Sequence, residues 1–183
     1  PKPLRKRIKK YRKLSKSLSK KTKGSKRYEK ARLKIAKFHA KLKDTRNYFL
    51  HKLSTEIIRE NQTIVLEDLN VYGMVKNQKL SRAILDLGWR TFRTFLEGKA
   101  EKYGRYFRVI SRWEPTSKIC SCCGFKGGKL DLSIREWECL NCGAKYDRDQ
   151  NSAINILVAG GQSETLNGHG GRQPDYCQSS SSL

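Results

Sequence analysis

The sequence predicts an α/β protein in which a long basic helical hairpin precedes a stretch of strands and helices and a small cysteine-rich module. Three observations carry this prediction. Apolar residues recur every three or four positions through most of residues 1–60, a short β-branched run follows at 63–69, and four cysteines stand in two CxxC pairs after residue 116. The order of helix pair, strand, helix and strand indicates an α/β layer with helical insertions.

The first element is a helical hairpin over residues 1–60. A helical apolar pattern runs to Leu18 and breaks around Gly24. It then resumes from Tyr28 to Ile57 with the same spacing, which predicts one long amphipathic helix.

Basic residues concentrate in this hairpin. The 183-residue chain has 40 Lys and Arg against 17 Asp and Glu, a net charge of +23, and residues 1–60 hold 23 basic and 4 acidic residues. Such asymmetry indicates a polyanionic partner, above all nucleic acid. The alternatives are a solvated charged face, a segment that aids solubility and a segment that binds acidic membrane surfaces. The residues that we expect to bind nucleic acid are Arg5, Lys6, Arg7, Lys9, Lys10, Arg12, Lys13, Lys20, Lys21, Lys23, Lys26 and Arg27.

Residues 61–115 are expected to form an α/β segment. The run "TIVLEDL" at 63–69 is short and apolar, which is typical of a buried central strand. An amphipathic stretch at 80–104 indicates helix, and 105–113 is a second strand candidate. Glu67 stands at the end of the first strand, where a buried carboxylate is costly unless it is paired or binds a metal ion.

Residues 116–146 are expected to form a separate zinc ribbon. Two CxxCG turns place four thiolates around one tetrahedral ion, and no coordination position is left for water, so the site is structural. A redox disulfide pair is the alternative. Cys122 would enter the ligand set only through a strained one-residue gap, and Cys177 is expected to be an incidental thiol. The expected ligands are Cys120, Cys123, Cys139 and Cys142.

A final helix is expected over residues 147–159, followed by a disordered Gly- and Ser-rich tail at 160–183. Asp147 and Asp149 flank the start of this helix. Either can be an N-cap, but one cap needs one residue, so an acid is left over. Acids from a strand end and a helix start, such as Glu67 and an aspartate here, are what a two-metal phosphodiester-cleaving site uses. Passive binding of nucleic acid is the alternative.

Four stretches together resemble one known family. They are "KGSKRYEKARLKIAKFHAKLKDTRNYFLHKLST", "TIVLEDLNVYGMVKN", "PTSKICSCCG" and "WECLNCGAKYDRDQNSAINIL", and they span about residues 3–160. In this order they resemble the C-terminal portion of the TnpB/OrfB proteins of insertion sequences. These proteins are often labelled transposases and are related to type V CRISPR effectors.

The resemblance implies a partial RuvC-like (RNase H-type) nuclease domain with an inserted zinc ribbon. It implies RNA-guided, Mg²⁺-dependent DNA cleavage, with a guide RNA and target DNA as partners and with structural zinc and catalytic magnesium as cofactors. The chain contains no apolar run of the roughly 18 residues that a membrane span needs and no signal-peptide core. A cytoplasmic, nucleoid-associated protein of a bacterium or archaeon is therefore expected.

The resemblance also implies roles for individual residues. Glu67 falls on the second catalytic acid of the family and Asp149 on the third, both as magnesium ligands. Asp147 is then the cap of the helix, and Asn151 and Asn155, four residues apart, are expected to support the acid. The ribbon ligands remain the four cysteines named above.

The chain departs from the family pattern before Glu67. The first catalytic Asp of the family lies on an upstream strand, and the acids before Glu67 all lie in helical patterns. We therefore expect a C-terminal fragment that is catalytically incomplete by itself. The alternative is a truncated, non-catalytic zinc-ribbon protein that binds DNA or RNA. A zinc-ribbon scaffold without catalytic ancestry would explain the charge and the cysteines but not the two acid positions.

Overall fold

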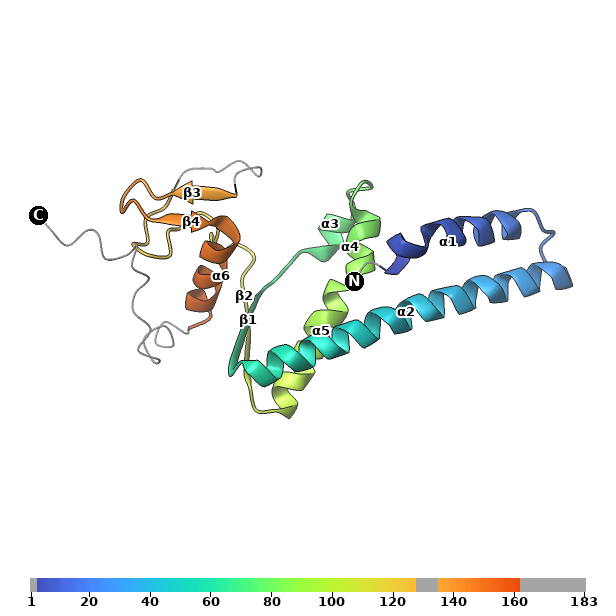
Figure 1. Ribbon diagram of the computed structural model, residues 1–183, viewed down its shortest axis with the longest axis horizontal. Helices are drawn as coiled ribbons and strands as arrows, with labels where there is room; N and C mark the ends of the chain where they lie inside the picture. The colour runs from blue at the N-terminus through green and yellow to red at the C-terminus, as the bar shows by residue number, and fades with distance from the viewer. Residues whose placement is uncertain (1–2, 128–134, 162–183) are drawn as a thin grey trace, which may run out of the picture. The chain divides into compact units, whose positions relative to one another are not determined.

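The computed structural model describes residues 3–127 and 135–161, which form two compact units (Figure 1). One unit contains the described residues up to Gln62 together with Asn70–Tyr106. The other contains Thr63–Leu69 and the described residues from Phe107 onward. The expected 61–115 segment is thus divided between the units. Most of the expected disordered tail, including Cys177, lies outside the described residues.

The first unit is built on the two helices of the hairpin, α1 (Pro3–Ser19) and α2 (Lys26–Glu60). The Ser25 side chain caps α2 by accepting the backbone N–H of Tyr28 at 3.1 Å. The two helices pack through aromatic rings, and the centroids of Tyr11 and Phe38 lie 6.0 Å apart in a stacked arrangement. The hairpin predicted from the apolar spacing is therefore confirmed.

The rest of this unit consists of three further helices: α3 (Val71–Val75), α4 (Ser81–Leu87) and α5 (Trp89–Lys102). The amphipathic stretch at 80–104 is thus two helices, which meet at Gly88. Gly88 has φ of +73°, and a Cβ there would lie 2.8 Å from Cδ of Arg46. Only glycine tolerates this conformation at such close approach.

A buried carboxylate joins three helices of the unit. Asp86 on α4 is 3% exposed. It accepts the backbone N–H of Leu4 at 3.0 Å and of Arg5 at 3.2 Å, at the N-terminus of α1. Its carboxylate also lies 3.4 Å from the Arg46 guanidinium of α2. Asp86 therefore supplies the negative charge that a helix N-terminus favours, although it lies some 80 residues away in the chain.

Helix α5 packs along α2 over an apolar core with a polar clamp beside it. Ile58 and Leu96 are each 1% exposed. At the edge of this contact, Nζ of Lys99 donates to the Ser54 and Thr55 hydroxyls, both at 2.7 Å. Burial lowers the pKa of Lys99, and the hydroxyl acceptors satisfy its ammonium group.

The second unit contains β1 (Thr63–Glu67), which is hydrogen-bonded to β2 (Tyr106–Ile110), a strand whose first residue belongs to the first unit. The bond from Tyr106 N to Gln62 O joins the starts of the strands and that from Asp68 N to Ile110 O joins their ends, so they run parallel. The expectation of a buried central strand is wrong for the described residues. Only Ile64 is buried in β1, because the strand has one hydrogen-bonded neighbour in this part of the chain.

The ribbon and the last helix complete this unit. Strand β3 (Glu136–Glu138) pairs antiparallel with β4 (Lys145–Asp147), and α6 (Arg148–Ala159) follows directly. The C-terminal end of α6 packs on β1, since a Cβ at Gly160 would lie 2.5 Å from a Val65 methyl carbon. Within the described ranges, no helix is long and apolar enough to cross a membrane.

Candidate metal centres and nucleic-acid interface

The two CxxCG turns adopt the same backbone geometry. In each turn the first cysteine donates its N–H to a carbonyl five residues later, at 2.9 Å for both Cys120 and Cys139. The glycine that follows the second cysteine donates back to the first, and Gly124 and Gly143 have φ of +71° and +67°. A side chain is disfavoured at such angles, which explains why glycine closes both turns.

This repeated geometry brings four sulfur atoms together. The Sγ atoms of the four predicted ligands all lie within 4.8 Å of one another, and Cys120 to Cys142 and Cys123 to Cys139 are both 3.7 Å. A tetrahedral zinc ion with Zn–S bonds of about 2.3 Å requires sulfur atoms about 3.8 Å apart. The four side chains therefore fit a structural zinc ion. Cys122 is not a member of this group, as predicted.

The thiols of the group differ in acidity. A hydrogen bond from the Asn141 side chain lowers the pKa of Cys123 to about 6. Burial raises the pKa of Cys142 to about 12. Since the thiolate is the form that binds metal, the lowered pKa of Cys123 favours metal binding, whereas the raised pKa of Cys142 opposes the loss of the proton that metal binding requires.

Asp147 and Asp149 have different roles at the start of α6. One oxygen of Asp147 accepts the N–H of Asp149 at 2.8 Å and of Gln150 at 3.1 Å, so Asp147 is the N-cap, as predicted. The Asp149 side chain is 81% exposed and lies 3.5 Å from the Arg135 guanidinium. Its carboxylate is therefore not used for capping and is open to solvent.

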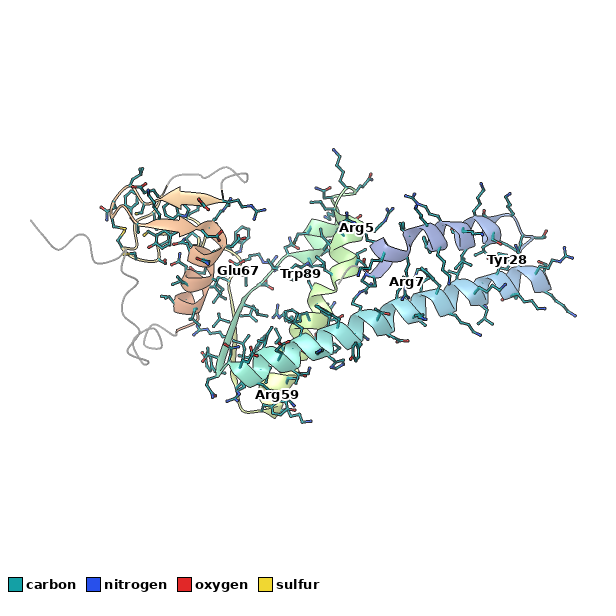
Figure 2. The ribbon with its side chains drawn as sticks, viewed as in Figure 1. Arg5, Arg7, Tyr28, Arg59, Glu67 and Trp89 are labelled. Carbon is teal, nitrogen blue, oxygen red and sulfur yellow. The ribbon has the colours of Figure 1, made fainter. Side chains whose placement is uncertain are left out.

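Glu67 and its neighbour Asp68 also differ. Asp68 is ion-paired with Arg112, whose Nε donates to it at 3.0 Å. Glu67 is partly buried, and its Oε1 accepts the hydroxyl of Thr116 at 2.7 Å. Among the described residues no hydrogen bond reaches Oε2 of Glu67, so this oxygen remains available to a cation. Figure 2 shows Glu67 at the end of β1, on the strand that α6 packs against.

A short hydrogen-bond chain leads from Glu67 to α6, the helix that carries Asp149. The Ser152 hydroxyl donates to the Thr116 hydroxyl at 3.1 Å, and Thr116 in turn donates to Glu67. Ser152 stands three residues after Asp149 on α6, and residues three apart lie on neighbouring turns of one helix face. Two hydrogen bonds therefore lead from Glu67 to within one turn of Asp149. Carboxylate oxygens such as those of Glu67 and Asp149 are ligands that suit Mg²⁺.

The side chains of Asn151 and Asn155 on α6 make their hydrogen bonds to residues 116–121. Asn151 is fully buried, accepting the N–H of Ser121 at 2.9 Å and donating to the carbonyl of Ile119 at 2.8 Å. Asn155 donates to the carbonyls of Thr116 and Ile119. Both side chains hold the backbone of the first cysteine turn. The sequence pointed to these asparagines, whereas it assigned no role to Thr116 or Ser152, although both stand in stretches that carry the family resemblance.

The predicted basic residues lie on α1, in the turn and at the start of α2. Most are exposed, and Arg7 and Lys21 are half-buried. Lys21 is satisfied locally, since its Nζ donates to the Ser17 carbonyl at 2.7 Å. Arg7 lies on the hairpin in Figure 2, between α1 and α2.

A basic groove runs between these two helices. It has a volume of about 570 Å³ and an apolar floor, which Leu14 and Phe38 contribute. Only two of the predicted residues, Arg7 and Lys10, line it, and α2 adds three lysines that the sequence analysis did not single out. Those lysines are Lys34, Lys37 and Lys41.

Two family models match the chain. Residues 1–78 match OrfB_IS605, described as "probable transposase". Residues 89–156 match the model described as Cas12f1-like, TNB domain. The first match covers the basic hairpin and β1, and the second covers α5, the ribbon and most of α6.

Curated relatives are similar over most of the chain. A Streptomyces pristinaespiralis protein provisionally named an RNA-guided DNA endonuclease is 53% identical over 148 residues, which are 81% of this chain and 37% of that protein. The Escherichia coli K12 protein InsQ, with the same provisional name, is 33% identical over 83% of this chain and 41% of its own length. The chain thus spans about two fifths of the length of these relatives.

A solved structure has a similar fold. One chain of a cryo-EM structure titled as a Cas12f1–sgRNA–target DNA complex matches 84% of this chain and 41% of its own length. The TM-score is 0.57 and the sequence identity is 21%. This similarity concerns the mixed helix and strand fold.

Proposed function

We propose, since the chain belongs to the TnpB/OrfB family of insertion-sequence proteins, that it is the C-terminal portion of an RNA-guided, Mg²⁺-dependent DNA endonuclease. The observation that carries this proposal is the hydrogen-bond chain from Glu67 through Thr116 to Ser152, one helical turn from Asp149. The two acid positions of the family thereby belong to one compact unit. An upstream strand of the complete protein supplies the first Asp of the RuvC-like site.

In this proposal Glu67 and Asp149 are magnesium ligands. Bound Mg²⁺ would activate a water molecule and stabilise the leaving oxygen of a phosphodiester. Oε2 of Glu67 is the proposed ligand atom, because Thr116 occupies the other oxygen and no hydrogen bond from the described residues reaches Oε2. Asp149 is accessible, and its ion pair with Arg135 is an exposed one that contributes little stability.

The basic hairpin binds nucleic acid in this proposal. Helix α2 has 35 residues, so it is about 50 Å long. Basic side chains along such a length suit the phosphate backbone of a guide RNA–target DNA heteroduplex, which needs no base-specific contact. The groove between α1 and α2 concentrates this charge on one surface of the unit.

The test is cleavage of guide-matched DNA by a longer protein in which the family's upstream strand precedes this chain. Glu67→Gln and Asp149→Asn keep the shape of each side chain and remove its charge. We expect each to reduce cleavage by about 100-fold or more, since a catalytic metal ion contributes several kcal/mol. Glu136→Gln, which removes an exposed acid on β3, is the matched control. Full cleavage by either active-site variant would contradict the proposal.

A second candidate function is binding without cleavage. The pairing of Asp149 with Arg135 favours this alternative, because the carboxylate then has a cationic partner within the protein itself. It predicts that the longer protein with all of its acids intact binds guide and target but leaves the target uncut at any Mg²⁺ concentration.

A further inference from the structure

The segment that leads into the first CxxCG turn contacts both acid-bearing elements of its unit. Residues 116–121 lie between the end of β1, where Glu67 stands, and α6, which begins beside Asp149. Thr116, Ile119 and Ser121 make polar contacts from this segment to those elements. The same segment contains Cys120, which lies 3.7 Å from Cys142 in the sulfur group.

Thr116 joins the segment to Glu67. It is 6% exposed, and both its hydroxyl and its carbonyl are hydrogen-bonded to these elements. Its hydroxyl donates to Glu67 Oε1 at 2.7 Å and accepts from Ser152, while its carbonyl accepts Nδ2 of Asn155 at 2.8 Å. The single hydroxyl proton is directed at Glu67, because Ser152 is the donor on the other side. Thr116 therefore fixes the position of the Glu67 carboxylate.

Asn151 joins the segment to α6. Its side chain is fully buried and makes one hydrogen bond on each side of Cys120, to Ser121 N and to Ile119 O. A second bond to the Ile119 carbonyl comes from Asn155 at 2.7 Å. The backbone that flanks a metal ligand is thus bound directly to the helix that carries Asp149.

We propose that the four-cysteine site controls the geometry of the carboxylate pair through this segment. Metal binding cross-links Cys120 to the second turn and fixes the conformation of residues 116–121. The fixed segment in turn holds α6 through Asn151 and holds Glu67 through Thr116. Asn151 and Thr116 are positioning residues. The assignment of the pair to catalysis rests on the proposed function, but the coupling between the metal and α6 does not.

Hydrogen exchange of the present chain tests the coupling without any cleavage. The zinc-loaded chain is compared with the same chain after treatment with a chelator. Removal of zinc is expected to raise amide exchange at least tenfold in residues 148–159 and 63–69, and to leave α2 unchanged. In Asn151→Ala, α6 is expected to exchange rapidly with or without zinc. Gln150→Ala, which changes an exposed neighbour on the same helix, is expected to behave as the unchanged chain. Equal protection of α6 with and without zinc in the unchanged chain would overturn the proposal, as would zinc-dependent protection that survives in Asn151→Ala.

If Asn151→Ala does not fold, a variant of Thr116 tests whether residues 116–121 position Glu67. In the longer protein, Thr116→Val removes the hydroxyl and keeps the shape of the side chain. We expect it to retain one zinc ion per chain and to need about 10- to 100-fold more Mg²⁺ for half-maximal cleavage, as for other groups that orient a metal ligand. Thr116→Ser restores the hydroxyl and the Mg²⁺ requirement. An unchanged Mg²⁺ requirement in Thr116→Val would overturn the proposal. If Glu67→Gln abolishes cleavage but zinc does not change the amide exchange of α6, the coupling alone is contradicted. If Glu67→Gln cleaves fully but zinc does change that exchange, the proposed function alone is contradicted.

Discussion

In the unit of α1 to α5, apolar side chains from successive turns of long helices form the core, with Leu42, Leu50, Ile58 and Leu96 all at 4% exposure or less. In the unit of β1, α6 and the ribbon, the most buried positions include Cys120, Cys139, Thr116 and Asn151. The first unit is stabilised by apolar burial, whereas the second relies on polar contacts and on a sulfur cluster. Small modules with so few aliphatic side chains usually need a metal ion to fold.

This difference separates the two halves of the proposed activity. The helical unit carries most of the charge that nucleic acid would bind, and its core does not depend on a metal. The ribbon unit carries both acid positions, and its order is expected to depend on zinc. Binding and cleavage should therefore respond differently to the loss of the metal.

The largest expected effect comes from removing a zinc ligand. Structural zinc contributes about 10–16 kcal/mol of folding free energy in small zinc domains. Cys139→Ser should therefore unfold the ribbon unit and leave the helical unit folded. Calorimetry is expected to show the loss of one unfolding transition, whereas Leu140→Ala, at a residue of the second turn that is 90% exposed, keeps it. A single transition that is unchanged by Cys139→Ser would contradict the metal dependence of this unit.

A smaller loss is expected in the helical unit from a core truncation. Leu96→Ala removes a side chain that is 1% exposed and leaves a cavity between α2 and α5. The expected decrease in unfolding free energy is about 2–5 kcal/mol, measured by urea unfolding. The matched control is Leu85→Ala, at a residue 58% exposed, with a change within about 0.5 kcal/mol. Equal changes in both variants would show that α5 does not pack on α2.

The buried carboxylate of Asp86 should contribute less than this core. Asp86→Asn weakens the bonds to Leu4 N and Arg5 N and leaves the Arg46 guanidinium without its charged partner. We expect a loss of about 1–3 kcal/mol in unfolding free energy. Glu29→Gln, which breaks the exposed pair with Arg32, should cost no more than about 1 kcal/mol. A loss for Asp86→Asn as small as that of the control would contradict its role at the N-terminus of α1.

Replacing the groove lysines is expected to change stability least. It should instead weaken the binding of nucleic acid. Replacing Lys34, Lys37 and Lys41 by Gln should reduce affinity for duplex and heteroduplex and lower the slope of affinity against salt by about one per lost phosphate contact. Lys76, Lys79 and Lys102, which lie elsewhere in the same unit, provide the control triple variant. An unchanged salt slope would show that the groove does not contact phosphates.

The sequence predicted most of the elements because their signals are local. Apolar spacing identified α1 and α2, and the CxxCG spacing identified the sulfur group, which depends on turns of a few residues. The local pattern left Asp147 and Asp149 as alternative caps of α6, and the family resemblance correctly assigned the cap to Asp147.

What the sequence did not predict depends on distant partners or on conformation. The split of one amphipathic stretch at Gly88 follows from a positive φ and from close contact with Arg46. The partial burial of β1, in which only Ile64 is buried, depends on which elements cover the strand, and its apolar run does not specify them. Thr116 and Glu67 are 49 residues apart, and no spacing rule connects a threonine hydroxyl with a carboxylate at that distance.

The claim that cleavage depends on zinc and that DNA binding does not is tested most directly by removing zinc from the longer protein and measuring both in the same samples. Guide-matched DNA is supplied with saturating Mg²⁺, and zinc content, DNA binding and cleavage rate are measured together. Cleavage is expected to fall in proportion to bound zinc and to return when zinc is restored, while affinity for DNA stays within about twofold because the helical unit is intact. A zinc-free protein that cleaves at the rate of the zinc-loaded protein would contradict the account.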